Sequence, residues 1–561
     1  MDFIVILVQN IYNKSIECET KLEKLYKNEF KEDVMGKVKV LTAREAIDMI
    51  KDGATVTMSG FVANGYAEAL HIAAEERFVE TGHPQNLTLF YVAGTGNKDG
   101  SFAEHYAHEG MIKRVIGGHY NFVPKICQML YDNKIEGYNI PQGAIAQMLR
   151  DNAAKKIGTF TSVGIGTFAD PRNGGGRLSE KTTEDIVELM EIHGEEQLFY
   201  PRIPIDVALI RGTYADELGN VTMEKEMAPL DCTAQAMAVH NNGGLVIVQV
   251  ERVVKAGQLD SKLVKIPGIY VDVVVECPAD DPSQAQSRGC AYDPAYAGNV
   301  QVPVSSLEPK KLDAKKIIGR RAAMELRKNV VVNLGVGVPE WVSSVAAEEG
   351  VADEMTLTVE CGPIGGVPGG GLRFGGTVNA QAYVDEAYQF DFYDGGGLDL
   401  CYLGLAEVDP AGNVNVSRLG TRITGSGGFT NISSNAKKAI FCGTFTNGVK
   451  IATGDGKLTI LQEGRQHKFI NKVTEITFSG VVAGKKVAKG EKEVLYVTER
   501  AVFALKEDGL HLIEIAPGVD LDKDVLGQMD FAPIVDRDEN GNVKLMDERI
   551  FVDAVMGMEI E

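Results

Sequence analysis

The sequence of 561 residues lacks the marks of a secreted or membrane-spanning protein. Its 8 cysteines form no C-x-x-C pair, which favours free thiols over a disulfide framework or a zinc site. No apolar run approaches the ~20 residues that a bilayer-spanning helix needs. The short apolar run from Phe3 to Val8 follows Asp2 instead of the basic residues that open a signal peptide. These absences predict a cytoplasmic protein with no membrane partner.

Positive charge is also in deficit. The chain has 57 Lys and Arg residues against 78 Asp and Glu residues, which gives a formal net charge of −21. Nucleic acids attract proteins through clustered basic residues, so we expect no nucleic-acid partner. The net charge does not exclude an anionic cofactor, because glycine turns and helix N-termini can hold anions through backbone N–H groups at any net charge.

Two nucleotide-binding signatures are incomplete. Near Gly456-Lys457 the P-loop pattern fails, because Leu458 replaces the Ser or Thr and Ile451 occupies the first glycine position. Gly94-Thr-Gly96 lacks the rest of the dinucleotide fingerprint, and its glycines are more typical of a turn at a strand end. The sequence therefore predicts no bound nucleotide of either type.

Two segments resemble metal sites only in part. His105 and His108 have the wrong spacing for the zinc-binding helix motifs. The segment 536–547 nearly fits a calcium loop, but its twelfth residue is Asp547 instead of Glu. Asn540-Gly541, between short apolar segments at 534–535 and 543–546, is a stronger signal for a β-hairpin. We expect no metal site.

The two ends of the chain differ in pattern. With 44% hydrophobic and 24% charged residues, the composition is globular and sufficient for large cores. Residues 1–34 do not share that pattern, since a short apolar run is followed by a charge-rich stretch. We interpret 1–34 as a leader, either a peripheral helix or the product of an upstream start codon, and Met35 as the natural start.

One order of elements recurs in the two halves. After Met35 the pattern predicts a strand at 37–41, a helix at 42–51 opened by a capping box of Thr42 and Glu45, and a strand at 54–58 before a glycine turn. Farther on, a helix at 314–327, a strand at 330–334 and the turn Gly335-Val-Gly337 repeat it. The fold class is therefore α/β, with two open parallel-sheet domains related by a remote internal duplication.

A proline-rich segment separates the halves. Between Cys277 and Lys315 the chain has five prolines with Ser and Gln between them and little helical periodicity, which is typical of a linker. We predict an N-terminal domain at 35–280, a linker at 281–312 and a C-terminal domain at 313–561.

The most unusual segment begins at Glu360. A β-rich run, Met355 to Val359, ends at this carboxylate, and a glycine-dense loop follows as far as Gly375. Ligands of open α/β sheets bind at the C-terminal ends of strands, and glycine lets the backbone approach them closely. Glu360 could equally cap a turn in a flexible loop. Cys361 has no His base near it in the sequence and is interpreted as a small packing residue.

Other segments could supply hydrogen-bond donors to an anion. Glycine clusters occur at 394–399, which includes Gly397, and at 424–432, which includes Gly427 and Gly428. Their N–H groups suit an oxyanion hole, although each cluster could also be a tight turn. Gln142 precedes a predicted helix, where its amide could donate to an oxygen anion or cap the helix at the surface.

Together these segments resemble the family I CoA-transferases, most closely the single-chain bacterial propionate or short-chain acyl-CoA:acetate enzymes. The resemblance rests on VECGPIGGVPGGGLRFG at 359–375, GSGGF at 425–429, NLGVGVPE at 333–340 and IPQG at 140–143, and it extends from about Met35 to the C-terminal region. It implies two domains of the CoA-transferase type, acyl-CoA and small carboxylates as substrates, and a homo-oligomer, expected to be a tetramer. It also implies that CoA is a co-substrate and that no cofactor is permanently bound.

The resemblance further implies roles for single residues. Glu360 matches the nucleophile that forms a glutamyl-CoA thioester, while Gln142 and the backbone N–H of Gly428 match the oxyanion donors. Gly397, Gly427 and Gly428 become candidates for contact with CoA. At an ordinary pKa near ~4.3, Glu360 would be ionised without a general base. The expected acids are acetate, propionate, butyrate and lactate. A non-catalytic metabolite sensor of the same fold and an acyl-CoA hydrolase remain alternatives.

Overall fold

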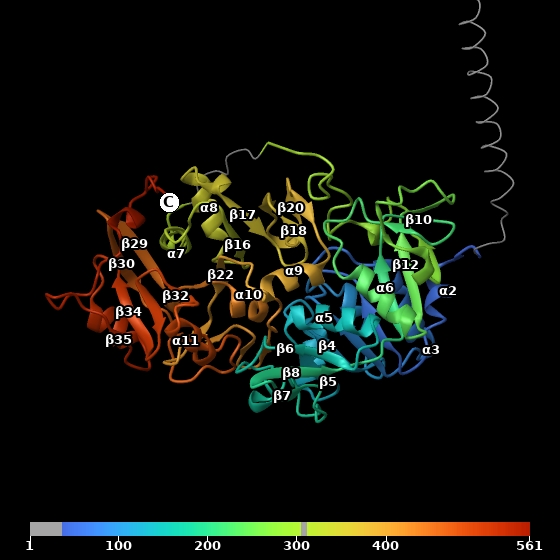
Figure 1. The fold of residues 1–561 in the computed structure, drawn as a ribbon, viewed down its shortest axis with the longest axis horizontal. Helices are drawn as coiled ribbons and strands as arrows, with labels where there is room; N and C mark the ends of the chain where they lie inside the picture. Colours follow the sequence, from blue (N-terminus) through green and yellow to red (C-terminus); the bar gives the residue numbers. More distant parts are fainter. Residues whose placement is uncertain (1–35, 304–310) are drawn as a thin grey trace, which may run out of the picture.

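Two large β-sheets, one from each half of the chain, form the frame of the protein (Figure 1). The computed structural model describes residues 36–303 and 311–561. The predicted leader at 1–34 lies outside these residues, as does part of the predicted linker. Within the described residues, no helix has both the length and the apolar character needed to cross a membrane.

The first sheet has eight strands, all parallel, in the order β1-β15-β12-β9-β2-β3-β4-β5. The strands are β1 (Lys39–Leu41), β2 (Thr55–Met58), β3 (Leu87–Tyr91), β4 (Ile112–Gly117), β5 (Glu136–Asn139), β9 (Val207–Arg211), β12 (Leu245–Val250) and β15 (Val273–Glu276). β3 and β9 are buried along their whole length, as expected of strands that helices cover on both faces.

The described part of this half has five α-helices. They are α2 (Ala43–Ile47), α3 (Glu68–Thr81), α4 (Pro124–Tyr131), α5 (Gln142–Ala153) and α6 (Cys232–Asn241). The capping box predicted at Thr42 and Glu45 is confirmed, because each side chain bonds the other's backbone N–H. The helix itself ends at Ile47, four residues before the predicted end, where turns lead to Gly53.

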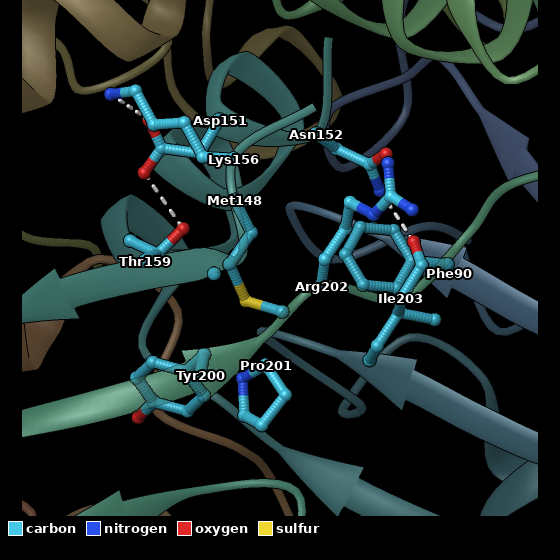
Figure 2. Close-up of a pocket in the computed structure, with 11 residues that line it drawn as sticks. Phe90, Met148, Asp151, Asn152, Lys156, Thr159, Tyr200, Pro201, Arg202 and Ile203 are labelled. Carbon is cyan, nitrogen blue, oxygen red and sulfur yellow. Dashed lines mark hydrogen bonds and ion pairs between the residues drawn. The ribbon is translucent and has the colours of Figure 1, made fainter. Parts of the chain in front are cut away.

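A small antiparallel sheet holds the C-terminal end of α5. It consists of β6 (Gly158–Thr161), β8 (Glu195–Pro201) and β7 (Glu188–Ile192). Asp151 of α5 accepts hydrogen bonds from Thr159 Oγ1 at 2.9 Å and Lys156 Nζ at 2.7 Å, and Asn152 donates to the Ile203 carbonyl (Figure 2). The gap among these side chains has a volume of about 10 Å³, room for one water molecule. The contacts therefore fix the helix that begins at Gln142.

A second small sheet of this half follows β9 and β12. It has four strands in the order β13 (Arg252–Val254), β10 (Tyr214–Asp216), β11 (Val221–Thr222) and β14 (Val264–Ile266). It continues at the carboxyl end of the large sheet, because β13 begins two residues after β12 ends.

The second large sheet has ten strands, in the order β21-β18-β17-β16-β22-β27-β32-β33-β34-β35. The five strands from β17 to β32 are parallel. Antiparallel pairs extend the sheet through β18 and β21 on one side and through β33 and β34 on the other, where β35 then pairs in parallel with β34. The strands are β16 (Val330–Leu334), β17 (Met355–Thr358), β18 (Pro363–Ile364), β21 (Ala382–Tyr383), β22 (Leu400–Gly404), β27 (Lys438–Cys442), β32 (Glu493–Val497), β33 (Ala501–Lys506), β34 (Gly509–Ile515) and β35 (Ile534–Val535).

Five helices and five short two-stranded pairs complete the described part of this half, and one of these pairs, β28 with β31, encloses the hairpin of β29 and β30. The helices are α7 (Ala314–Ala323), α8 (Glu340–Glu348), α9 (Glu386–Asp394), α10 (Phe429–Asn435) and α11 (Gly480–Ala488). The strand pairs are β19 (Val367–Pro368) with β20 (Thr377–Val378), β23 (Glu407–Val408) with β24 (Val414–Asn415), β25 (Arg418–Leu419) with β26 (Arg422–Ile423), β28 (Thr446–Asn447) with β31 (Gln466–His467), and β29 (Lys450–Gly454) with β30 (Lys457–Gln462). The predicted strand at 330–334 is confirmed, and the predicted helix at 314–327 ends four residues early.

The β-hairpin predicted around Asn540-Gly541 is wrong. β35 pairs in parallel with β34, and Leu545 on the other side of the turn bridges to Ile515 at the end of β34. The turn itself forms, since Gly541 N donates to the carbonyl of Asp538 at 2.9 Å. Both flanks add to an existing sheet instead of to each other, because an isolated two-stranded pair is only marginally stable.

The two sheets meet at equivalent glycine turns. β2 leads to Gly60 and Phe61, β16 leads to Gly335 and Val336, and Phe61 and Val336 line one cavity. Between the sheets, α5 packs against α9 and α10 (Figure 1). This arrangement supports the predicted duplication.

Candidate active site

A cavity of about 620 Å³ lies where the two halves meet, a volume within the usual range of small-molecule sites. From the first half it is lined by Phe61, Val62, Gly94, Asn97, Lys98, His119, Asn121, Phe122 and Gln142. From the second half it is lined by Asn333, Gly335, Val336, Glu360, Gly371, Leu372, Phe374, Leu403, Gly404, Val416, Thr424, Gly425, Ser426, Gly427, Gly428, Phe429 and Ile432. Four residues singled out in the sequence, Glu360, Gln142, Gly427 and Gly428, therefore come together.

Glu360 lies two residues after the end of β17, at the carboxyl edge of the sheet. Its side chain is buried, with 8% exposed, and lies beside Asn333 of the neighbouring strand β16. Burial raises the pKa of Glu360 above its ordinary value, against hydrogen bonds from its own backbone N–H and from Asn333. The sequence suggested an ordinary pKa. A carboxylate that has lost hydration is more basic, which makes it the better nucleophile.

Gly427 and Gly428 lie between Glu360 and Gln142. A Cβ added to Gly428 would lie 3.5 Å from Glu360 Cγ, and one added to Gly427 would lie 3.5 Å from Gln142 Oε1. Gly427 has φ +51, a conformation that glycine adopts without strain, and Gly428 is the N-cap of α10. The N–H of Gly428 has no acceptor within the described parts of the chain, so it is available to a ligand.

Gln142 is the first residue of α5 and is 2% exposed. Its backbone N donates to the Gly427 carbonyl at 3.1 Å. Its side-chain Nε2 donates to Oε1 of Glu386, the first residue of α9, at 2.5 Å. A primary amide has two N–H groups, so one remains for an acceptor in the cavity.

A further hydrogen-bond chain joins α5 to α10. The backbone N of Gly143 donates to Asn431 Oδ1 at 3.0 Å, and Asn431 Nδ2 donates to both carboxylate oxygens of Asp394, each at 3.0 Å. A Cβ on Gly143 would stand 2.4 Å from Asn431 Nδ2, so the helices approach closely only because this residue is glycine. The two candidate donors are therefore held in one rigid network.

Comparisons with known proteins match this arrangement. A sequence family described as Coenzyme A transferase matches residues 40–277. Acetate CoA-transferase YdiF of Escherichia coli O157:H7 is 47% identical over 528 residues, which cover 93% of this chain and 97% of that protein. Caffeate CoA-transferase of Acetobacterium woodii is 43% identical over 530 residues, 92% and 99% of the two chains. The chain belongs to the coenzyme A transferase family.

The solved structures agree with that assignment. The crystal structure of the acyl-CoA transferase YdiF from E. coli O157:H7, as a thioester complex with CoA, superposes with a TM-score of 0.87 at 45% identity, covering 94% of this chain and 98% of that one. The two-domain α/β architecture of the CoA-transferases is therefore confirmed. The protein is a CoA-transferase, an enzyme that moves CoA between an acyl-CoA and a carboxylate, with CoA as co-substrate.

Gly397 is not among the residues that line the cavity. This residue follows α9, its N–H donates to the Phe392 carbonyl at 2.9 Å, and a Cβ on it would stand 2.2 Å from the Phe392 ring. Its lack of a side chain serves packing at the end of α9, so the geometry gives no support to a contact between Gly397 and CoA.

Several cavity residues of the transferase were missed in the sequence. His119 follows β4 and a glycine pair, and burial, with smaller effects of Lys98 and Arg422, lowers the pKa of His119 to about 4. It is therefore neutral at pH 7, and its Nδ1 has no hydrogen-bond partner in the portion of the chain described. Asn333 is the first residue of the segment NLGVGVPE at 333–340, but no role was predicted for it. A polar residue directly after a strand and a glycine pair was the available signal for His119.

Two other sequence features have structural partners. Cys361 Sγ donates to the Gly375 carbonyl at 3.1 Å, and burial raises the pKa of this thiol well above its ordinary value. His105 contacts Glu68 and Glu75, and His108 also contacts Glu75. Across 36–303 and 311–561, no cluster of three or more His, Cys, Asp or Glu side chains could hold a metal ion.

Proposed function

We propose that this transferase exchanges CoA between a short-chain acyl-CoA and a small free carboxylate such as acetate, with Glu360 as the covalent nucleophile. The observation that carries the proposal is a single buried carboxylate, Glu360, beside the free N–H of Gly428 in a cavity built by both halves. The similarity to an enzyme named acetate CoA-transferase supports acetate as one of the acids.

In the first half-reaction, a carboxylate oxygen of Glu360 attacks the thioester carbonyl. The tetrahedral intermediate collapses with loss of CoA thiolate and leaves an acyl-glutamyl anhydride. The thiolate then attacks the glutamyl carbonyl, the donor acid leaves as its carboxylate, and a glutamyl-CoA thioester remains. A second carboxylate reverses both steps and departs as the new acyl-CoA. One thioester replaces another, so the exchange is nearly isoenergetic and needs no ATP.

The main chemical demand is stabilisation of the tetrahedral oxyanion. Glu360 is a weak nucleophile even after desolvation, and removal of one oxyanion donor typically costs ~10²-fold or more in rate. The free N–H of Gly428 and the second N–H of the Gln142 amide are assigned this task. They come from different halves of the chain, so the complete site requires the junction between them.

The cavity suits more than one acid. Most of its wall is apolar, and a methylene group changes binding in such pockets by only ~1 to 3 kcal/mol. We expect acetate, propionate, butyrate and lactate to be accepted. The name of the caffeate enzyme makes a larger aromatic acid the natural counter-example to include in a screen. The domain limits 35–280 and 313–561, the homotetramer and the cytoplasmic location stay predictions.

Trapping of the covalent intermediate tests the proposal. Incubation with acetyl-CoA and no acceptor should add the mass of CoA less one water molecule to the peptide that contains Glu360, and later addition of propionate should remove the adduct as propionyl-CoA. The same digest of a Glu354→Gln variant, which alters an exposed glutamate six residues earlier, should show the same adduct.

Four results would contradict the proposal. An adduct on another residue, or none at all with transfer intact, would exclude Glu360 as the nucleophile. Release of free CoA in the absence of acceptor, at a rate equal to transfer, would instead identify an acyl-CoA hydrolase. No turnover of any acyl-CoA would favour the metabolite sensor.

A further inference from the structure

A pair of buried carboxyl groups lies behind Gln142, outside the proposed chemistry. Glu386 is 1% exposed and Asp231 is 4% exposed, and the two side chains are hydrogen-bonding neighbours. The backbone N of Glu386 also donates to the carbonyl of Leu230, which precedes Asp231, at 3.1 Å. Neither carboxyl group lines the cavity. The pair therefore contacts the site through Gln142, to which Glu386 Oε1 is bonded at 2.5 Å.

The hydrogen-bond partners of the pair favour one proton shared between the two groups. Asp231 Oδ1 is buried and finds no donor in the described structure. Two ionised carboxylates cannot hydrogen-bond to each other, whereas a protonated carboxyl can donate with one oxygen and accept with the other. Since Glu386 Oε1 already accepts from Gln142, Oε2 is the oxygen of Glu386 that is left to carry the proton.

The electrostatic surroundings favour that proton. Burial raises the pKa of Glu386 well above its ordinary value and that of Asp231 to about 7. The titratable groups that face the pair are Glu360, Cys361, Cys232, Tyr66 and Asp385. Each of them is neutral or negative, and the cation Lys265 is 3.8 Å from Asp385.

We propose that Glu386, protonated at neutral pH, is a positioning residue for the oxyanion donor Gln142. Its hydroxyl donates to Asp231, and its carbonyl oxygen holds one N–H of the Gln142 amide, which directs the other N–H into the cavity. An ionised Glu386 would add a second negative charge near Glu360 and would oppose the oxyanion. The inference rests on the proposed role of Gln142 in CoA transfer.

Two substitutions separate positioning from mere packing. Glu386→Gln reproduces the protonated acid, because the new amide can accept from Gln142 and donate to Asp231, and it should keep kcat within about threefold. Glu386→Ala removes the acceptor, and kcat should fall by about tenfold to hundredfold with little change in the KM for acyl-CoA. The control is Asp151→Asn, which removes a carboxylate at the far end of the same helix, α5 (Figure 2).

The pH profile is the deciding measurement. The wild-type enzyme and Asp151→Asn should lose kcat on the alkaline side as the carboxyl pair gives up its proton, whereas Glu386→Gln carries no such proton and should lack this limb. An alkaline limb unchanged in Glu386→Gln, or a wild-type kcat in Glu386→Ala, would overturn the inference. If Glu386→Ala does not fold, the presence or absence of the alkaline limb in the kcat profile of Glu386→Gln tests the inference by itself. A normal adduct on Glu360 in these variants leaves the proposed function intact, so the two failures are distinguishable.

Discussion

The two walls of the cavity come from similar folds but carry different chemistry. Among the described lining residues, the N-terminal wall offers neutral polar groups and one cation, Lys98, while the C-terminal wall contributes the only carboxylate, Glu360. Both walls lie at the carboxyl ends of parallel strands that continue into glycine turns. The related architecture therefore provides the cavity, and the differences between the halves place the proposed nucleophile on one side and the proposed neutral donor on the other.

Replacement of the C-terminal nucleophile should have the largest effect. Glu360→Gln keeps size and hydrogen bonding but cannot form the anhydride, so kcat should fall by roughly 10³-fold or more while the melting temperature stays near wild type. Steady-state transfer from acetyl-CoA to propionate measures this, with Glu354→Gln as the exposed control. Transfer at near wild-type rate would show that the carboxylate on the C-terminal wall is dispensable.

Removal of the N-terminal donor should have the next largest effect. Gln142→Ala deletes the side-chain N–H that faces the cavity and leaves Gly428 as the remaining donor, so kcat should fall by about 10²-fold with a smaller change in KM. Gln128→Ala, at an exposed amide of α4 bonded to Asp132, is the control and should be silent. An effect on KM alone would indicate that Gln142 binds ground state and transition state equally.

The close contact between the halves can be broken without touching a reacting group. In Gly143→Ala the new Cβ would stand 2.4 Å from Asn431 of α10 and 2.6 Å from the Phe390 ring of α9, so α5 must move away from both helices. We expect kcat to fall about tenfold and the free energy of unfolding to fall by about 1 to 3 kcal/mol.

Gly484→Ala in α11 is the matched control for that shift. Its added Cβ meets nothing closer than 3.9 Å, and alanine favours a helix over glycine. Equal loss of kcat in both variants would show that the junction of α5 and α10 is not what holds the donors in place.

How far the sequence predicted this site depends on the range of each interaction. Glu360, Gln142 and Gly428 were correctly predicted to lie close together, because each stands in a local motif at a turn or helix start, and their catalytic roles stay predictions. The hydrogen bond between Gln142 and Glu386 joins residues 244 positions apart, and the one between Gly143 and Asn431 joins residues 288 positions apart. No local sequence pattern could predict either of these hydrogen bonds. Gly397 shows the opposite error, since a glycine that packs against Phe392 has the same local pattern as one that binds a ligand.

The same limit applies to the fold. Strand 330–334 and the capping box at Thr42 depend on neighbouring residues and were predicted well. The hairpin at Asn540-Gly541 failed because Ile534 and Leu545 found partners on β34, a strand that the local sequence does not reveal.

The carboxylate of Asp394 gives the C-terminal half a pH dependence of its own. Burial raises the pKa of Asp394 from an ordinary 3.8 to about 7, although Asn431 donates to both oxygens. Between these values the folded protein holds more protons than the unfolded chain, so the free energy of unfolding falls as pH rises. The Asp394→Asn variant lacks this titrating carboxyl group. Its free energy of unfolding, relative to that of the wild type, should therefore rise by up to roughly a few kcal/mol from pH 5 to pH 8. Urea unfolding of both proteins at the two pH values measures this change. The same difference in the free energy of unfolding at pH 5 and pH 8 would contradict the prediction.

The smallest effect is expected from the cation on the N-terminal wall. Lys98 lies at the cavity with its Nζ 5.9 Å from the centre of the Phe122 ring, and it is the one Lys or Arg among the described lining residues. CoA carries phosphates, so Lys98→Ala should raise the KM for acetyl-CoA by about threefold to tenfold and leave kcat nearly unchanged, with the difference shrinking at high salt. Lys125→Ala removes an equal charge from a nearby exposed site outside the cavity and should leave KM unchanged. Equal effects of both variants would mean that overall charge, and not the wall itself, attracts the acyl-CoA.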